Sequence, residues 1–200
     1  VLFRSVFPKP LVDICGAPLI EYTLRGLIPI AGQSRFTFVV QEDDCKSYSL
    51  DDVVRVVVGA ARTAIVAISA PTQGAICSCL MAIDHIDPDE ELLITNGDQV
   101  LLTNINSAID DFRRRDLDAG VVTVSSTHPR FSYVRVDDEG CVVETAEKRV
   151  ISRLAIAGLY YFRKGRDFID AAKRVLINNN PVHDSFLDRK STRLNSSHVK

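Results

Sequence analysis

The sequence lacks any apolar run long enough to cross a bilayer, which argues against a membrane-spanning helix. It also lacks an excess of charge of one sign, because 24 Lys and Arg stand against 26 Asp and Glu, a formal net charge of −2. Without a basic stripe or a polybasic anchor, the expected partner is a small molecule, with no nucleic acid and no membrane. The five cysteines are odd in number and show no paired spacing, which favours a reducing, cytoplasmic setting. Cys77 and Cys79 would point about 200° apart on the helix expected there, so we predict no metal site at this pair.

Both ends of the sequence are expected to be non-native. Residues 1–5 can be encoded by GTGCTCTTCCGATCT, and the reverse complement of those bases, read from its second base, encodes residues 188–192. One oligonucleotide read on opposite strands therefore accounts for both ends, and the match to sequencing-adapter sequence continues to His198. We expect one partial domain over residues 6–187, and we exclude residues 1–5 and 188–200 from fold reasoning as adapter read-through. The remaining length suits one compact domain with a substantial core.

Residues 92–100 are the stretch around which we expect the chain to be organised. A short apolar run, Leu-Leu-Ile-Thr, is typical of a strand buried on both faces, and it stops at Gly97-Asp98. In an open α/β sheet, ligands bind beyond the carboxyl ends of the strands, so Asp98 is a candidate metal ligand. The residues alone equally allow Asp98 to cap the turn that follows, as Asp does after many strands.

Strand and helix patterns alternate along the rest of the chain, with no internal repeat, low-complexity tract or linker. Helices are predicted over residues 19–27, 51–58, 75–84 and 166–177 and from residue 105 onward, and further strands over residues 36–40, 63–68, 120–124, 133–136, 141–145 and 157–162. The β-loop-α-β pattern from residue 63 to residue 100 predicts a parallel strand pair with a right-handed crossover. The predicted fold class is α/β: a three-layer α/β/α domain with a mixed sheet, parallel first and antiparallel later.

Several short motifs stand in an order that resembles the sugar-phosphate nucleotidyltransferases. They are Phe-Pro-Lys-Pro-Leu at residues 7–11, Gly-Ala-Pro-Leu-Ile at 16–20, Gln-Gly at 73–74, Asn-Gly-Asp at 96–98, Glu-Lys at 147–148 and Ala-Gly-Leu-Tyr at 157–160. The resemblance covers residues 6–187 and looks closest to the branch found with capsule and surface-polysaccharide genes, where residues 128–133 and 144–148 also fit. It implies a Rossmann-like, GT-A-like nucleotide-diphospho-sugar transferase fold with a mainly parallel sheet.

The resemblance also implies a reaction, in which an oxygen of a sugar 1-phosphate attacks the α-phosphorus of a nucleoside triphosphate and pyrophosphate leaves. Such a reaction asks the protein to align two anions and to neutralise charge. Lys9 resembles the family lysine that contacts the triphosphate, and the prolines on either side of it stiffen its backbone. Asp98 resembles the aspartate that holds Mg²⁺ between the phosphates, a hard cation that needs oxygen ligands. The implied catalytic residues are Lys9, Asp98 and Lys148, and the implied metal ligand is Asp98.

On the nucleotide side, the resemblance implies binding by Lys9, Gln73, Gly74 and Gly97. Gln73 and Gly74 look like the loop over the base, where a glycine allows close backbone approach and an amide side chain can read a base edge. A plain loop-to-helix turn is the alternative interpretation of these two residues.

On the sugar-phosphate side, Lys148 resembles the lysine that contacts the phosphate, and Glu147 the acid that binds sugar hydroxyls. Gly158 and Tyr133 stand where the family lines the sugar pocket, although packing explains either residue equally well. The implied partners are a nucleoside triphosphate and a sugar 1-phosphate, and the resemblance is compatible with a homo-oligomer.

The sequence departs from the family pattern in two places. The glycine-rich loop of this branch, G-x-G-x-R-F, is expected immediately before Phe7, where the adapter-like residues stand. A second metal-binding aspartate is expected beyond residue 187. The phosphate cradle and one metal ligand of the family are therefore missing from residues 6–187.

Two other functions remain open. A glycosyltransferase of similar architecture would hold its metal with a D-x-D pair, but Gln99 and Val100 follow Asp98. A regulatory paralogue that binds a nucleotide sugar without turnover is disfavoured because Lys9, Asp98 and Lys148 occur together.

Overall fold

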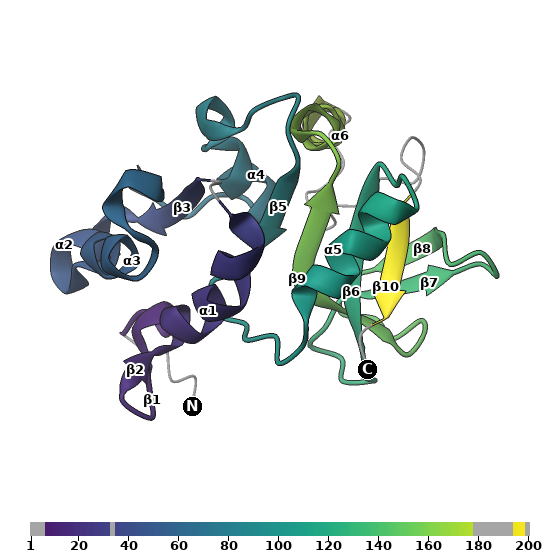
Figure 1. Ribbon diagram of the computed structural model, residues 1–200, viewed down its shortest axis with the longest axis horizontal. Coiled ribbons are helices and arrows are strands. Elements are labelled where there is room, and N and C mark those ends of the chain that lie inside the picture. The colour runs from purple at the N-terminus through teal and green to yellow at the C-terminus, as the bar shows by residue number, and fades with distance from the viewer. Residues whose placement is uncertain (1–6, 33–34, 178–193, 199–200) are drawn as a thin grey trace. The chain divides into compact units, whose positions relative to one another are not determined.

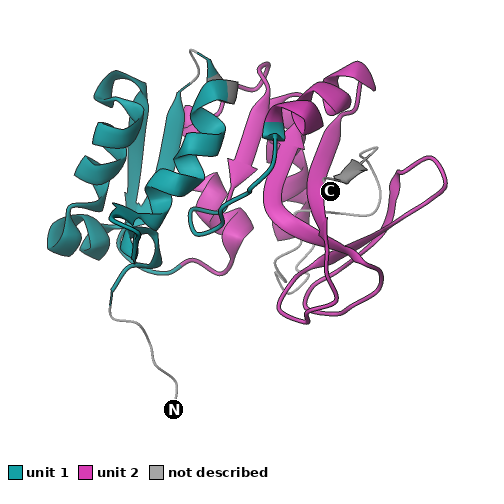
Figure 2. Cartoon of the chain, turned by 60° about the horizontal axis from the view of Figure 1, so that its bottom comes forward, with its two compact units in different colours: residues 1–71, 96–105 teal, residues 72–95, 106–200 magenta. Residues whose placement is uncertain are grey.

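The computed structural model describes residues 7–32, 35–177 and 194–198. The chain divides into two compact units, which are described separately: unit 1 is residues 1–71 with 96–105, and unit 2 is residues 72–95 with 106–200 (Figure 2). Residue 6 and residues 178–187, which belong to the predicted domain, lie outside the described residues. Within the described ranges, no helix is long and apolar enough to span a membrane.

Unit 1 consists of a short hairpin, a parallel strand pair and the helices packed on it. Its elements are a 3₁₀ helix η1 (Lys9–Leu11), β1 (Asp13–Ile14), β2 (Ala17–Pro18), α1 (Leu19–Ala31), β3 (Phe36–Gln41), α2 (Glu42–Tyr48), α3 (Leu50–Val58), a 3₁₀ helix η2 (Ala60–Arg62) and β4 (Thr63–Ile68). Strands β3 and β4 pair in parallel along their whole length. The core of unit 1 forms where α1 and α3 meet the apolar side chains of β3.

Helix α3 shows how spacing outweighs residue preference in unit 1. Its valines favour strands, because branching at Cβ restricts their rotamers in a helix. However, Leu50, Val54 and Val58 recur every four residues and are all buried, whereas Val56 is 84% exposed. One buried stripe at helical spacing is what an amphipathic surface helix requires, so the predicted helix over residues 51–58 is confirmed.

Unit 2 is built around one long strand, β9 (Leu154–Phe162). Its other elements are α4 (Ala75–Leu80), a 3₁₀ helix η3 (Ile83–His85), β5 (Leu92–Thr95), α5 (Ile105–Arg114, whose first residue falls in unit 1), β6 (Ala119–Ser125), β7 (Tyr133–Val136), β8 (Val142–Ala146), α6 (Gly165–Ile177) and β10 (Leu194–His198). Strands β5, β6 and β7 all pair antiparallel with β9, so these three run in the same direction (Figure 1).

Successive residues of β9 send their side chains to opposite faces of the sheet, and helices cover both faces. Tyr161 stacks on Phe112 of α5 with ring centroids 5.4 Å apart, and Phe162 contacts Phe168 of α6 at the same separation. Ile76 of α4 joins the cluster on the α6 side. Unit 2 is therefore a sheet between two helical layers, and the predicted α/β fold class with helices on both faces is confirmed.

The pairing predicted for the organising strand is wrong. Strand β4 pairs with β3, and β5 takes β9 as its partner, antiparallel, instead of forming a parallel pair with β4. A β-loop-α-β pattern fixes the direction of two strands but leaves open which strand becomes the hydrogen-bonded neighbour. Helix α4 is also shorter than predicted, because the chain turns at Met81 and continues as η3.

Strand β10 lies in the tail that we excluded from fold reasoning. It pairs in parallel with β6 through five residues, from Leu194 opposite Ala119 to His198 opposite Thr123. Such a ladder uses backbone N–H and C=O groups, which nearly any sequence supplies. The presence of β10 therefore does not bear on the origin of the codons that encode it.

Gly165 at the start of α6 is expected to tolerate no side chain. A Cβ there would lie 2.3 Å from the backbone oxygen of Asp87, and the Gly165 N–H donates to the Glu90 carbonyl at 2.8 Å, so the backbone cannot easily move away. Gly165→Ala should lower the free energy of unfolding by about 1–3 kcal/mol. Gly26→Ala in α1 is the matched control, because its Cβ would make an ordinary 3.5 Å contact and alanine favours a helix, so it should add about 0.5–1 kcal/mol. Urea unfolding followed by circular dichroism checks both changes, and equal midpoints for the two variants would contradict the prediction.

Candidate functional site

Lys9 and Asp98, which are distant in sequence, meet in unit 1. The Lys9 Nζ lies 3.8 Å from Asp98 Oδ2, and the two side chains are 75% and 41% exposed. Lys9 begins η1 directly after the buried Pro8, whose carbonyl accepts the Leu11 N–H at 3.0 Å. The lysine thus extends from a short, hydrogen-bonded turn toward the carboxylate, as its position between two prolines predicts.

The turn that carries Asp98 rests on α1. The Thr23 hydroxyl donates to the Gln99 carbonyl at 3.3 Å, and the Asn96 side-chain amide donates to Gln99 Oε1, also at 3.3 Å. A Cβ added at Gly97 would make an ordinary 3.6 Å contact with Ile20, so packing within unit 1 does not by itself require a glycine there. The backbone next to Asp98 is thus tied to α1, while the Asp98 carboxylate is partly exposed.

The donor set around Asp98 fits one kind of metal ion. In the described parts of the chain, no three His, Cys, Asp or Glu side chains gather into a group that could enclose a metal. Magnesium does not need such a cage, since it keeps several waters and is commonly bound by one or two carboxylates together with substrate phosphates. An exposed ion pair as long as Lys9–Asp98 contributes little to stability, so a cation that displaced it would cost the fold little.

Gln73 and Gly74 form the loop that opens α4 in unit 2. Gly74 has φ +147°, a region that side chains disfavour, so a glycine is needed to turn the chain into the helix. The Gly74 carbonyl accepts hydrogen bonds from the Thr72 hydroxyl at 3.0 Å and the Ser78 N–H at 3.1 Å. The neighbouring Gln73 is exposed. The loop is therefore fixed by its own hydrogen bonds and presents the amide of Gln73 to solvent.

The strand register of unit 2 brings three of the four predicted sugar-phosphate residues to one end of the β7–β8 hairpin, while Gly158 lies in the middle of β9. Tyr133, the first residue of β7, lies opposite both Ala146, the last residue of β8, and Ala155 of β9. Glu147 and Lys148 follow Ala146 directly in the chain. Gly158 lies three residues along β9 from Ala155. The sequence positions are scattered, but the β7–β8 ladder brings Tyr133, Glu147 and Lys148 to one end of the hairpin.

Strand β9 is irregular around Gly158. The β6–β9 register shifts between the pairs Val121–Tyr160 and Thr123–Ile156, and Gly158 lies inside the shift with φ +72°. The β5–β9 ladder stops at the neighbouring pair Thr95–Leu159. A positive φ explains why a glycine stands in an otherwise apolar strand, because it bends the strand at a bulge.

Tyr133 and Lys148 occupy opposite environments at this end of the sheet. Tyr133 has no exposed surface, and its hydroxyl donates to the His128 carbonyl at 2.7 Å. The packing interpretation of Tyr133 therefore holds, since the side chain has no face to offer a ligand. Lys148 is 69% exposed and pairs with Glu147 at 3.1 Å, and its φ of +49° is rare for a residue with a side chain. Such backbone strain concentrates at functional sites, which draws attention to Lys148.

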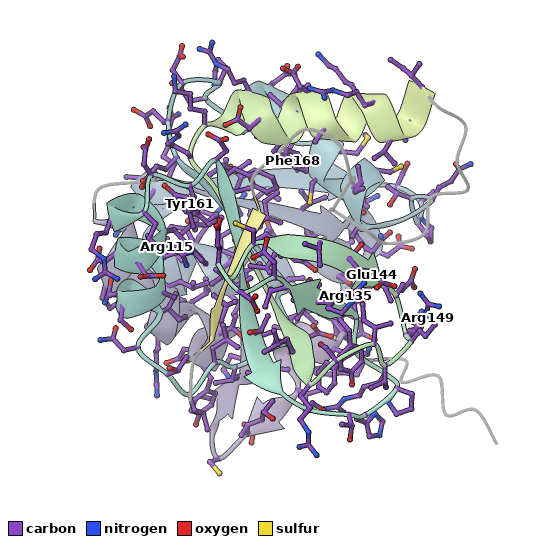
Figure 3. The ribbon with its side chains drawn as sticks, turned by 90° about the vertical axis from the view of Figure 1, so that its right-hand side faces the viewer. Arg115, Arg135, Glu144, Arg149, Tyr161 and Phe168 are labelled. Carbon is purple, nitrogen blue, oxygen red and sulfur yellow. The ribbon has the colours of Figure 1, made fainter. Side chains whose placement is uncertain are left out.

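A charged network beside Lys148 was not predicted. Glu144 pairs with Arg135 across the hairpin at 2.6 Å and with Arg149 at 3.3 Å, and the three side chains lie together on the β7–β8 side of the sheet (Figure 3). The hairpin pattern places residue 135 opposite residue 144, so cross-strand charge pairing was the available signal. Glu144 thus pairs with two arginines close in sequence or register to Lys148.

The cysteines of α4 give no second site. Burial raises the pKa of the Cys79 thiol to about 11, so this group stays protonated and is a poor metal ligand at neutral pH. Cys77 and Cys79 lie two residues apart on α4, a spacing that turns their side chains to different sides of the helix.

The sequence and the fold both match known nucleotidyl transferases. A model of the family described as "Nucleotidyl transferase" matches residues 4–197. The structure is similar to a nucleoside-diphosphate-sugar pyrophosphorylase from Vibrio cholerae RC9, with a TM-score of 0.75 and 16% identity over 98% of this chain and 85% of that one. It is also similar to a UDP-glucose pyrophosphorylase from Acinetobacter baumannii, with a TM-score of 0.72 and 14% identity over 98% and 80% of the chains.

A third solved structure, HddC from Yersinia pseudotuberculosis complexed with GMP-PN, has a TM-score of 0.69 and 19% identity over 99% of this chain and 85% of its own. At such identities the likeness shows the fold. No protein of curated function matches the sequence.

Proposed function

The chain belongs to the nucleotidyl transferase family, and we propose that it transfers a nucleotidyl group from a nucleoside triphosphate to a sugar 1-phosphate. In this reaction an oxygen of the sugar phosphate forms a bond to the α-phosphorus, and the bond from that phosphorus to the bridging oxygen of the β-phosphate breaks. Pyrophosphate leaves, and a nucleotide sugar remains. The observation that carries the proposal is the approach of Lys9 to Asp98, because it provides a cation and a metal-ligating carboxylate at one place.

Lys9 and Asp98 are proposed to act at the triphosphate. The ammonium group of Lys9 neutralises phosphate charge and holds the chain of phosphates in line for attack. Asp98 would hold Mg²⁺, which when bound spreads the charge that develops on the phosphate oxygens. The hydrogen bonds from Thr23 and Asn96 to Gln99 keep the carboxylate in place without help from the ligand.

Gln73, Gly74 and Gly97 are proposed to serve the nucleotide. The exposed amide of Gln73 carries both a donor and an acceptor, which suits reading a base edge. The positive φ of Gly74 explains why a glycine stands in this loop. Its contact with the nucleotide base is part of the proposal. Gly97, where unit 1 has room for a Cβ, leaves space for a ligand to approach the backbone beside Asp98.

Glu147, Lys148 and Gly158 are proposed to bind the sugar phosphate. Lys148 supplies a charge for the phosphate, and Glu147, only 19% exposed, supplies a carboxylate for sugar hydroxyls. Gly158 lies in the register shift of β9 and is proposed to line the sugar pocket. Tyr133 is retained as a positioning residue, because its buried hydroxyl ties residue 128 to the start of β7.

The setting proposed for this reaction is the cytoplasm, and its products would serve capsular or surface-polysaccharide synthesis. The support is the resemblance at residues 128–133 and 144–148. A glycosyltransferase is the alternative, and the products separate the two, since a glycosyltransferase releases a nucleoside diphosphate and this reaction releases pyrophosphate. The missing D-x-D pair at Asp98 favours pyrophosphate.

Lys148→Ala is expected to impair use of the sugar phosphate far more than use of the nucleotide. One charge-assisted contact to phosphate contributes about 1.5–3 kcal/mol, so kcat/KM for the sugar phosphate should fall about 10-fold to 100-fold. Pyrophosphate release over a panel of sugar phosphates, in the enzyme that carries its native flanking codons, measures the change. Lys173→Ala on α6 removes an exposed lysine from the same unit and should change nothing. Unchanged sugar-phosphate kinetics in Lys148→Ala would remove this residue from the proposed site.

A further inference from the structure

Arg130 differs from most arginines of unit 2, because it forms no ion pair with any residue that the structure describes. The arginines that do pair with a carboxylate are Arg113, Arg114, Arg115, Arg135, Arg149, Arg163 and Arg166. The Arg130 guanidinium instead lies over the Phe131 ring, with Cζ 4.7 Å from the ring centroid, and the residue is exposed. A cation that is held over a ring and lacks an acidic neighbour is available to bind an anion.

The backbone that carries Arg130 is fixed by hydrogen bonds. Its own N–H donates to His128 Nδ1 at 3.2 Å. The His128 carbonyl accepts the Tyr133 hydroxyl at 2.7 Å, and the Ser132 carbonyl accepts the Ile156 N–H at 2.8 Å, so both the start and the end of the turn are anchored to the sheet. A ligand that used Arg130 would not have to order this loop first.

The β7–β8 register places Arg130 and Lys148 at the same end of the hairpin. Tyr133 opens β7 opposite Ala146, which closes β8. Arg130 precedes Tyr133 by three residues, and Lys148 follows Ala146 by two. Neighbouring strands lie about 4.8 Å apart, so the two backbone segments that flank the paired ends of β7 and β8 begin close together.

We infer that Arg130 is a second contact for the phosphate group of the sugar phosphate, alongside Lys148. This inference rests on the proposed function and names a residue that the proposal did not include. The two cations have complementary roles. The planar guanidinium donates two parallel hydrogen bonds to phosphate oxygens, while the ammonium of Lys148 acts as a point charge. Glu147 takes up part of the charge of Lys148, and none of the described carboxylates does so for Arg130.

The test is a ³¹P NMR titration of the 200-residue chain with α-D-glucose 1-phosphate and, in a separate arm, inorganic phosphate. Arg130→Ala and Arg130→Gln should each weaken binding of both probes about tenfold or more. The glutamine variant keeps the stem over Phe131, and neither variant touches the backbone bond to His128, so thermal unfolding should stay unchanged. Arg153→Ala is the matched control, because Arg153 is exposed, forms no ion pair among the described residues and offers its carbonyl, not its side chain, to Ser126.

Weaker binding in both Arg130 variants with normal binding in Arg153→Ala supports the inference. Normal binding in the Arg130 variants together with weak binding in Lys148→Ala overturns the inference and leaves the proposed function standing. An equal loss of binding in Arg153→Ala also overturns the inference, because removing any exposed positive charge would then weaken binding. Normal binding in all variants, or none in the parent chain, overturns the assignment of sugar phosphate to this end of unit 2.

Discussion

Asp98→Asn is expected to lower the rate of pyrophosphate release about 100-fold or more in the enzyme that carries its native flanking codons. The amide keeps the size of the side chain but loses the negative charge that a divalent cation needs, and a bound metal contributes several kcal/mol of charge stabilisation to the transition state. The fold should be unchanged, because Asp98 is 41% exposed and its ion pair with Lys9 is long and solvated.

The control for this prediction is Asp43→Asn on α2, which removes a charge from another exposed aspartate of unit 1. Steady-state kinetics at several Mg²⁺ concentrations, with circular dichroism of each variant, provide the comparison. Asp98→Asn with a rate close to that of the parent enzyme would exclude Asp98 from the mechanism. An equal loss in both variants would show that the effect arises from overall charge and not from a metal ligand.

Helices and strands that are marked by residues close in sequence were predicted well. Strand β4 runs over residues 63–68 as predicted, and α1 begins at Leu19 after Pro18, because a proline is favoured beside a helix start. Helix α2 was missed. Its acidic first turn suits a helix start, but its seven residues carry no buried side chain to reveal a helical period.

Pairing and burial could not be predicted from local signals. The partner of β5 depends on β9, which lies far along the chain, and the apolar run at residues 92–95 is compatible with either partner. For the same reason the sequence left Tyr133 open between a sugar-pocket residue and a packing residue, because only the folded structure shows that its side chain is buried. The meeting of Lys9 with Asp98 is likewise non-local, and the resemblance to a family, more than any spacing, pointed to it.

The interactions of Arg130 could not be predicted from the sequence, even though the motif around it was recognised. Its place in the motif at residues 128–133 was noted, yet its lack of a carboxylate partner follows only from the positions of the acidic residues in unit 2. Nor does the sequence show that the His128 ring accepts the Arg130 N–H. Whether a charged side chain has an ion-pair partner depends on the folded surface, so it could not be derived from residue type.

The 200-residue chain as it stands is expected to be inactive, since we propose that its first five residues replace the glycine-rich loop of the family. Such a loop points backbone N–H groups at the phosphates, and removing one preorganised donor costs about 100-fold to 1000-fold in rate. Two or three losses amount to about four to eight orders of magnitude. Among the described residues β3 has β4 as its only strand partner and β5 has only β9, so each of these strands has an edge that no described strand covers.

The decisive comparison is between this chain and one in which a G-x-G-x-R-F loop is placed immediately before Phe7, assayed for pyrophosphate release over a panel of nucleoside triphosphates and sugar phosphates. Sedimentation of both proteins belongs to the same experiment, because the uncharged strand β3 should promote association where its edge is open. The added loop should restore pyrophosphate release, since the phosphate cradle is proposed to lie there. Equal activity of the two chains would show that Lys9, Asp98 and Lys148 suffice without the loop. The proposal that loop N–H groups bind the phosphates would then be wrong.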